Sequence, residues 1–255
     1  MRTLTLTFAI LALLVGLPTL GAAAPDPEQG KAMSAMTVAE LERAGDDARA
    51  QKDYLTAIEY FKVALRRDPK NAVLFNKMGM ARLKKGDMYA ARSDFQKAVK
   101  LNPKYANALN NIGAVDFAHK KLGSAVKHFK KAVALEETTA TFHVNLGAAW
   151  FAQNKLERAF VEYARALELD PEVLNSSARA GVVAQMATPE ERAKYSYLLA
   201  KIYARRGDLE NCLRCLRKAK EDGYRELANV YRDEEFASLR QDTRLSEVVP
   251  PPIAK

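Results

Sequence analysis

The chain has 255 residues and carries 40 Lys and Arg against 31 Asp and Glu, a formal net charge of +9 at pH 7. This excess is compatible with attraction to an anionic polymer or membrane surface. No aromatic residues are interleaved with the lysines and no nucleic-acid motif accompanies them, so nucleic acid is not expected as a partner. None of the three histidines pairs with a cysteine or carboxylate at metal-ligand spacing, so neither a metal nor a cofactor is expected.

Residues 1–23 have the pattern of a secretory signal peptide. Arg2 is the only charge, an almost wholly apolar run covers residues 4–17, Pro18 ends it, and small residues precede a cleavage point before Ala24. The alternative is an uncleaved membrane anchor, but the run is somewhat short of the ~20 residues that a helical span needs. We therefore predict export to the periplasm or the outside of the cell, with membrane association only if the signal sequence is uncleaved.

The first folded segment is predicted to begin at Thr37. Residues 24–36 contain Pro, Gly, Asp, Glu and Gln without periodicity, which indicates a flexible lead-in. Thr37 and Glu40 then have the spacing of a capping box, in which the threonine accepts from the first turn of a helix and the glutamate reaches back.

Residues 37–173 repeat one pattern with a step of 34 residues. A glycine, an alanine, an aromatic residue and a second alanine each keep this step. The four columns are Gly79, Gly113 and Gly147; Ala57, Ala91, Ala125 and Ala159; Phe61, Phe95, Phe129 and Tyr163; and Ala64, Ala98, Ala132 and Ala166. Prolines follow on the same step, with Glu137 where one is missing. A fixed period in this range indicates a solenoid of repeats.

Within each period, apolar residues at three- and four-residue steps indicate two amphipathic helices joined by a tight turn. In the second period, Gly79 and Ala91 are small where the two helices are expected to cross. Phe95 is expected to supply bulk at the joint with the next period. Pro103 cannot continue the helix before it and separates the periods.

These positions resemble the tetratricopeptide repeat. The units are 38–71, 72–105, 106–139 and 140–173, with a weaker fifth at 193–226 in which Cys212 replaces the small alanine. The resemblance implies an all-α fold, a right-handed superhelical solenoid of antiparallel helix pairs. It also implies that the first helices line a concave groove.

The rest of the chain is assigned from local signals. Residues 174–192 leave the repeat pattern and are predicted to hold an extra helix or linker, within which Thr188 and Glu191 restart a helix. Glycines at 207 and 223 end the two helices of the fifth unit. Residues 227–249 are predicted to form a helical cap, and 250–255 an extended proline-rich tail.

Cys212 and Cys215 lie inside the second helix of the fifth unit, and Cys212 occupies a packing position. A structural role is therefore favoured, because reactive pairs sit at helix starts, where the dipole lowers the thiol pKa. A local disulfide or a metal role is the alternative.

The repeat resemblance places positions 2, 5, 6, 9 and 13 of each unit, counted from its first residue, on the concave groove. The candidate partner-binding residues are Asn76, Lys77, Met80, Asn107, Asn110, Asn111, Val144 and Asn145. An amide offers one acceptor and two donors, so these asparagines suit an extended peptide backbone. The alternative is that they only cap or hydrate the surface. The cations of the carboxylate clamp known in this family are missing, so a receptor for chaperone C-termini is not expected.

No phosphate loop, nucleophile elbow or paired-carboxylate signature is present, so the chain is not expected to be an enzyme. The leading hypothesis is a scaffold of the bacterial cell envelope that binds a partner segment in the groove. One form of this hypothesis places the scaffold in a larger envelope assembly. The alternative is an electrostatic adaptor whose basic outer face binds an anionic envelope polymer or membrane surface. That face comprises Lys97, Lys120, Lys121, Lys127, Lys130 and Lys131, which could equally be a solvated helix face. A redox or accessory role through the cysteines is a third hypothesis.

Overall fold

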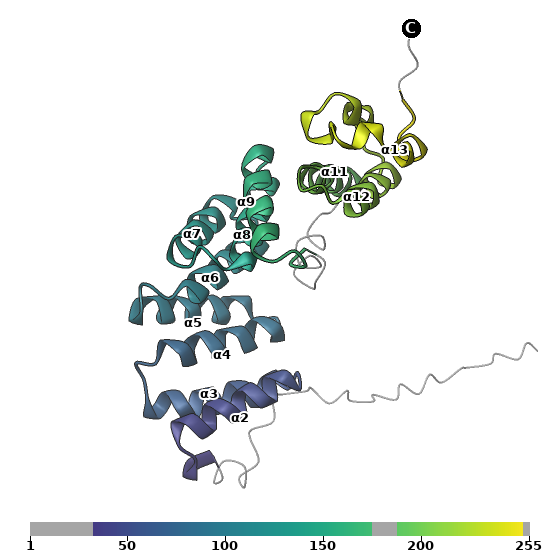
Figure 1. The fold of residues 1–255 in the computed structure, drawn as a ribbon. Helices are drawn as coiled ribbons and strands as arrows, with labels where there is room; N and C mark the ends of the chain where they lie inside the picture. Colours follow the sequence, from purple (N-terminus) through teal and green to yellow (C-terminus); the bar gives the residue numbers. More distant parts are fainter. Residues whose placement is uncertain (1–32, 175–187, 252–255) are drawn as a thin grey trace, which may run out of the picture.

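The structure is a computed structural model in which residues 33–174 and 188–251 are described. Regular structure in these two ranges is helical, and successive helices pack as antiparallel pairs that stack along one direction (Figure 1). The predicted all-α solenoid is thereby confirmed. The predicted signal peptide, most of the lead-in, residues 175–187 of the predicted extra helix or linker and the end of the tail lie outside the described residues.

Each repeat unit is a pair of helices. The first four pairs are α2 (Val38–Ala50) with α3 (Tyr54–Arg67), α4 (Ala72–Lys85) with α5 (Met88–Leu101), α6 (Ala106–Ala118) with α7 (Leu122–Leu135), and α8 (Ala140–Ala152) with α9 (Leu156–Leu169). The next pair is α11 (Pro189–Arg205) with α12 (Leu209–Glu221). Short 3-10 turns η1 (Leu227–Tyr231), η2 (Glu234–Phe236) and η3 (Leu239–Gln241) and helix α13 (Thr243–Val248) follow.

Helix starts and ends follow the local signals. Thr37 Oγ1 accepts from Glu40 N at 3.3 Å, and Glu40 Oε2 accepts from Thr37 N at 2.7 Å, which completes the predicted capping box. Thr188 and Glu191 form the same box at the start of α11. Helix α11 stops before Gly207, whose φ of 72° lies in the left-handed region that ends helices.

The two helices of a unit cross at the repeat position of small residues, as predicted. A Cβ added to Gly79 would lie 2.6 Å from Cε1 of Phe95, too close for any real contact. Gly45, which stands 34 residues before Gly79, has the same relation to Phe61. The aromatic column therefore fills the crossing inside its own unit. Phe95 also belongs to one core cluster with Ile112 and Val115 of the third unit, as expected at the joint between units.

The predicted lead-in is shorter than 24–36. Met33 is buried and belongs to the same core cluster as Leu41 and Phe61. Arg67 also donates through Nη2 to the carbonyl oxygen of Met33 at 3.4 Å. The segment just before Thr37 therefore packs onto the first unit.

The fifth pair is offset from the others by an insertion. Tyr163 and Leu216, which share one repeat position, are 53 residues apart, 19 more than the period. The core nevertheless runs on across this joint, where the rings of Tyr163 and Tyr195 meet edge to face with centroids 5.5 Å apart. Phe236 of the cap region is buried in the same core.

Cys212 is a buried thiol in the structure, with none of its surface exposed. Burial raises the pKa of the Cys212 thiol to about 12, and the neighbouring Cys215 and Asp208 add to the rise. The thiolate is the reactive form, so this environment favours the structural role. No group of metal-binding side chains occurs among the residues that the structure describes.

We expect Cys212 in the native chain to react with a thiol-reactive dye far more slowly than an exposed cysteine, because its thiolate is scarce and inaccessible. In denaturant, both of the chain's cysteines should label rapidly. The measurement is absorbance-monitored labelling at pH 8. Rapid labelling of Cys212 in the native chain would revive the redox hypothesis.

Candidate functional site

The first helices of units one to four are joined by a ladder of polar side chains. In each step the residue at position 6 donates to the residue at position 5 of the preceding unit, 35 residues earlier. The steps are Lys77 to Glu42, Asn111 to Asn76 at 2.9 Å, and Asn145 to Asn110 at 2.8 Å. We call these six residues the polar ladder.

The ladder uses only part of the hydrogen-bonding capacity of its amides. Asn111 and Asn145 each donate through Nδ2, and neither side-chain Oδ1 accepts a hydrogen bond from the described part of the chain. Both side chains are half-buried, and so is Asn110. An amide can accept and donate at once, so each retains a group that an approaching backbone could bind.

The remaining predicted groove residues have different surroundings. Asn107 is exposed, whereas Asn76 and Val144 are buried, with 4% and 1% of their surface accessible. Asn76 donates to the hydroxyl of Tyr105 at 3.3 Å and lies 3.7 Å from the sulfur of half-buried Met80. Asn76 and Val144 therefore support the face rather than line it.

Lys77 is held at the first step of the ladder. Its ammonium binds Asp46 as well as Glu42, two of the carboxylates of α2. The two ion pairs and their hydrogen bonds outweigh burial of the ammonium, and the pKa of Lys77 is raised. This cation is engaged within the chain and is not held ready for an anionic partner.

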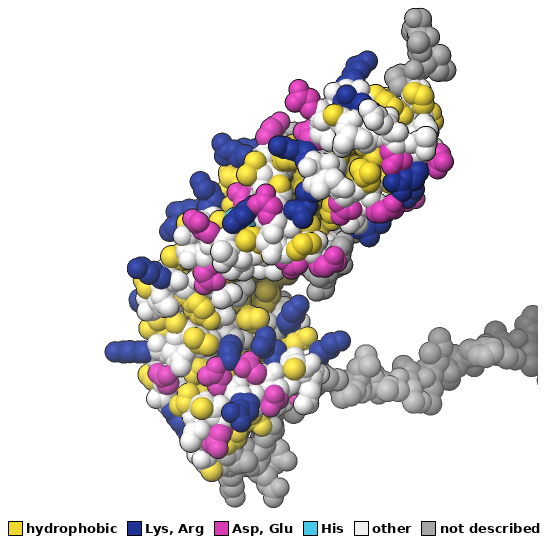
Figure 2. Space-filling view, viewed as in Figure 1, with side chains coloured by type: hydrophobic (Ala, Val, Ile, Leu, Met, Phe, Trp, Pro, Cys, Tyr) yellow, Lys and Arg dark blue, Asp and Glu magenta, His cyan; other side chains and the backbone are white. Residues whose placement is uncertain are grey.

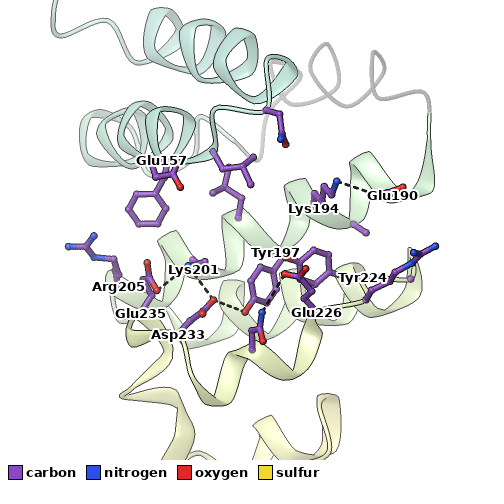
Figure 3. A pocket seen from close by; sticks show the side chains of 18 of the residues that line it. Glu157, Glu190, Lys194, Tyr197, Lys201, Arg205, Tyr224, Glu226, Asp233 and Glu235 are labelled. Atoms are coloured by element: carbon purple, nitrogen blue, oxygen red, sulfur yellow. Dashed lines mark hydrogen bonds and ion pairs between the residues drawn. The ribbon is translucent and has the colours of Figure 1, made fainter.

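A cleft of ≈ 780 Å³ opens between α9, α11 and the segment from Gly223 to Glu235 (Figure 3). The α11 side chains that line it include positions 2, 5, 6, 9 and 13 of the fifth unit. They are Lys194, Tyr197, Leu198, Lys201 and Arg205. These are the positions that the sequence assigned to the groove in units two to four, but here they face α9 and the cap. We call this space the junction cleft.

Aromatic rings and ion pairs shape the junction cleft. The rings of Tyr197 and Tyr224 stack with centroids 4.4 Å apart. The Tyr197 hydroxyl donates to Asp233 at 2.9 Å, and the pKa of Tyr197 is raised by burial and by that carboxylate. Lys201 lies 3.2 Å from both Asp233 and Glu235 (Figure 3).

A second cleft of ≈ 600 Å³ lies next to the first and shares Phe160, Val161 and Arg205 with it. His143 borders this second cleft, with Nδ1 2.7 Å from Glu162 Oε2 and Nε2 3.0 Å from the carbonyl oxygen of Glu137. Both ring nitrogens are thereby occupied, so His143 is a structural residue.

Comparison with known proteins agrees with this geometry. The tetratricopeptide repeat profile matches residues 76–139 and 117–173, and a second profile with the same description matches 193–221. The chain belongs to the tetratricopeptide repeat family. Members of this family are non-catalytic protein-interaction scaffolds, and this chain is therefore not an enzyme. No curated protein sequence matches the chain.

Solved tetratricopeptide repeat structures share the fold. MamA from Desulfovibrio magneticus RS-1 is 22% identical, with a TM-score of 0.52 over 72% of this chain and 93% of that one. YrrB, described as having an unusual peptide-binding site, is 18% identical, with a TM-score of 0.51 over 80% and 96%. TTC0263 from Thermus thermophilus is 21% identical, with a TM-score of 0.50 over 79% and 98%.

The sequence did contain a signal for the junction cleft. The repeat positions that give the groove residues of units two to four also exist in unit five, where they give five of the α11 residues that line the cleft. The signal was incomplete because the partner surfaces, α9 and the segment from Gly223 to Glu235, lie outside the repeat rule.

The six lysines of the predicted basic face are exposed. Lys97 lies on α5, and the others lie on α7 or in the turn before it. None of the six makes an ion pair with the described residues. Figure 2 shows Lys and Arg side chains projecting from the side on which Figure 1 places α5 and α7. No described helix is both long enough and apolar enough to cross a bilayer.

Proposed function

We propose that this chain is an exported scaffold of the bacterial cell envelope that binds an extended segment of a partner protein along α4, α6 and α8. The localisation rests on the signal-like residues 1–23. Binding is supported by the repeat family, and by YrrB, a protein of the same fold described as having a peptide-binding site. The partner could belong to a larger envelope assembly.

The observation that carries the proposal is the unused capacity of the polar ladder. Asn111 and Asn145 are one repeat apart, both are half-buried, and both keep an acceptor oxygen and one N–H beyond the ladder bond. An extended backbone presents donors and acceptors in alternation. Two amides held in equivalent places can therefore bind it at two points without selecting side chains.

The proposal is tested by affinity capture from envelope extract, using the full chain as bait. The double variant Asn111→Ala/Asn145→Ala should retain a defined partner at least about tenfold less well, as expected for about 1.4 kcal/mol of lost hydrogen bonding. Asn107→Ala removes an exposed groove amide outside the ladder, so it should weaken capture without lowering stability. Equal retention of the same partner by the wild type, the double variant and Asn107→Ala would contradict groove binding.

Two controls separate binding from folding. The double variant also breaks two ladder bonds, which should cost about 1–2 kcal/mol of unfolding free energy, so thermal unfolding is measured on each bait. Ser93→Ala, on the second helix of unit two, is exposed and outside the ladder. It should behave as wild type in both assays.

The basic face is a second candidate, favoured by six exposed lysines without carboxylate partners among the described residues. Electrostatic binding through them should fall steeply with salt because counterions are released. Capture that is lost at high salt and is indifferent to the asparagines would assign the function to this face. Capture that persists at high salt and needs the asparagines would assign it to the groove.

A further inference from the structure

Position 22 of the repeat is polar in four units and holds an exposed apolar residue only in unit four, at the junction cleft. Position 22 is occupied by Glu59, Ser93, Lys127 and Arg214 in the other four units. In unit four it is Val161, and 63% of this side chain is exposed. The other units have polar residues at this position, and a partner that covered Val161 would remove its apolar surface from water.

Val161 is the edge of a larger apolar surface. Phe160 beside it is half-buried, and both side chains line the two adjoining clefts. Across the junction cleft lie the stacked rings of Tyr197 and Tyr224. Aromatic side chains of this kind contribute much of the energy at protein interfaces because they bury a large area at low entropic cost.

Two arginines at the end of α11 border the same surface. Arg205 lies over the ring of Phe160, 5.4 Å from its centroid, and Arg206 lines the adjoining cleft. Both are exposed, and neither makes an ion pair with any described residue.

The carboxylates of the junction cleft are mostly committed elsewhere. Asp233 and Glu235 bind Lys201, and Glu190 binds Lys194 at 3.0 Å. Glu157 also lines the cleft and is exposed. In the adjoining cleft, Glu162 pairs with His143 and Glu168 with Arg165. Arg205 and Arg206 therefore stand beside an apolar patch without an ion-pair partner among the described residues.

We propose that this surface is a second docking site, specific for a peptide segment in which a large apolar side chain stands close to an acidic one. The apolar side chain covers Val161 and Phe160 and enters the junction cleft toward Tyr197. The carboxylate binds the guanidinium groups of Arg205 and Arg206, which suit bidentate recognition of carboxylates. The site uses no residue of the polar ladder, so it is independent of the proposed groove function.

The test is a random-peptide display selection on the immobilised full chain, followed by fluorescence polarisation with labelled synthetic copies of the enriched peptides. Enriched sequences should pair a large apolar residue with Asp or Glu within four positions. Val161→Glu, which installs the residue of unit one, and Val161→Ser should each weaken these peptides at least about tenfold. Arg205→Ser/Arg206→Ser should weaken them and reduce the salt dependence of binding.

Matched variants make the outcome specific. Ser93→Glu places the same side chain at the same repeat position in unit two, away from the clefts, and should bind as wild type. Asn111→Ala/Asn145→Ala should also bind as wild type. The proposal is overturned if no sequence is enriched, if basic or wholly polar peptides dominate, or if both Val161 variants bind normally. Loss of binding only in the asparagine variant would overturn it too, and would place these peptides in the groove.

Discussion

Replacing Gly113 with alanine is expected to lower the free energy of unfolding by about 1–3 kcal/mol, the usual cost of overfilling a packed interior. The added Cβ would lie 2.7 Å from both Cδ1 and Cε1 of the Phe129 ring. That ring is 2% exposed, so it has nowhere to move without displacing its neighbours. The penalty outweighs the roughly 1 kcal/mol by which alanine is the better helix former.

Gly123→Ala, in the same unit, is expected to change the free energy of unfolding in the opposite direction. Gly123 lies in the first turn of α7, and a Cβ there meets nothing within 4 Å. Alanine at this position should raise stability by about 0.5–1 kcal/mol because only the backbone entropy changes. Gly147→Ala should be milder than Gly113→Ala, since its Cβ would lie 3.0 Å or more from the Tyr163 ring. Urea unfolding of the three variants gives the order, and a destabilised Gly123→Ala or a neutral Gly113→Ala would contradict this account.

The crossing of helices within a unit follows from the sequence because its determinants are local. Gly113 and Phe129 stand 16 residues apart in one unit, and the helix periodicity alone places them on facing surfaces. The same period also reaches Gly45, so the first unit carries the full column. Predictions that depend on residues within one unit were therefore reliable.

Contacts between units cannot be predicted from the repeat period alone. The repeat pattern gives each groove residue a position within its unit, but that position alone does not show that Asn111 bonds Asn76 or that Val144 is buried. Those facts depend on how one unit turns against the next. The junction cleft was less predictable still, because the 19 additional residues before unit five uncouple its orientation from that of unit four.

Two buried carboxylates show how hydrogen-bond partners decide the effect of burial. Asp94 and Asp116 both have fully buried side chains. Asp94 binds Arg82 at 2.6 Å through Oδ2, but its Oδ1 has no hydrogen-bond partner among the described residues. Burial therefore prevails over Arg82 and raises the pKa of Asp94 to about 6.

Asp116 has partners on both oxygens. Oδ1 accepts from Arg92 at 3.0 Å, and Oδ2 accepts from the Ser124 hydroxyl at 2.6 Å and lies 3.0 Å from His128 Nδ1. Burial acts to raise the pKa of Asp116, but Ser124, Arg92 and His128 together outweigh it and the pKa is lowered. This carboxylate links α5, α6 and α7 across the joint between units two and three.

Asp116→Asn is expected to lower the free energy of unfolding at pH 7 by about 3 kcal/mol, the lower end of the cost of removing one partner from a buried ion pair. The lower end applies because Arg92 and His128 keep side-chain exposures of 30% and 22%, so water offsets part of the loss. The sign of the pH dependence follows from the lowered pKa. In the wild type, the contribution of Asp116 is complete above the unfolded pKa of about 3.9 and is lost as the pH falls through the lower folded value. The variant should not show this loss of stability at acid pH.

Asp94→Asn is the matched comparison because it makes the same chemical change in an equally buried carboxylate. For Asp94 the folded pKa is the higher one, so its contribution is complete below about pH 3.9 and is lost as the pH rises through about 6. Removing the charge should therefore abolish the fall between pH 4 and 6, which is about 3 kcal/mol for a rise of roughly two pKa units. Stability at pH 8 should rise by the part of this that the weakened Arg82 contact does not offset. Urea unfolding of both variants from pH 3 to 8 separates the two effects. Equal destabilisation by the two substitutions at pH 8 would show that burial alone, and not the partners of each oxygen, sets the energy of these carboxylates.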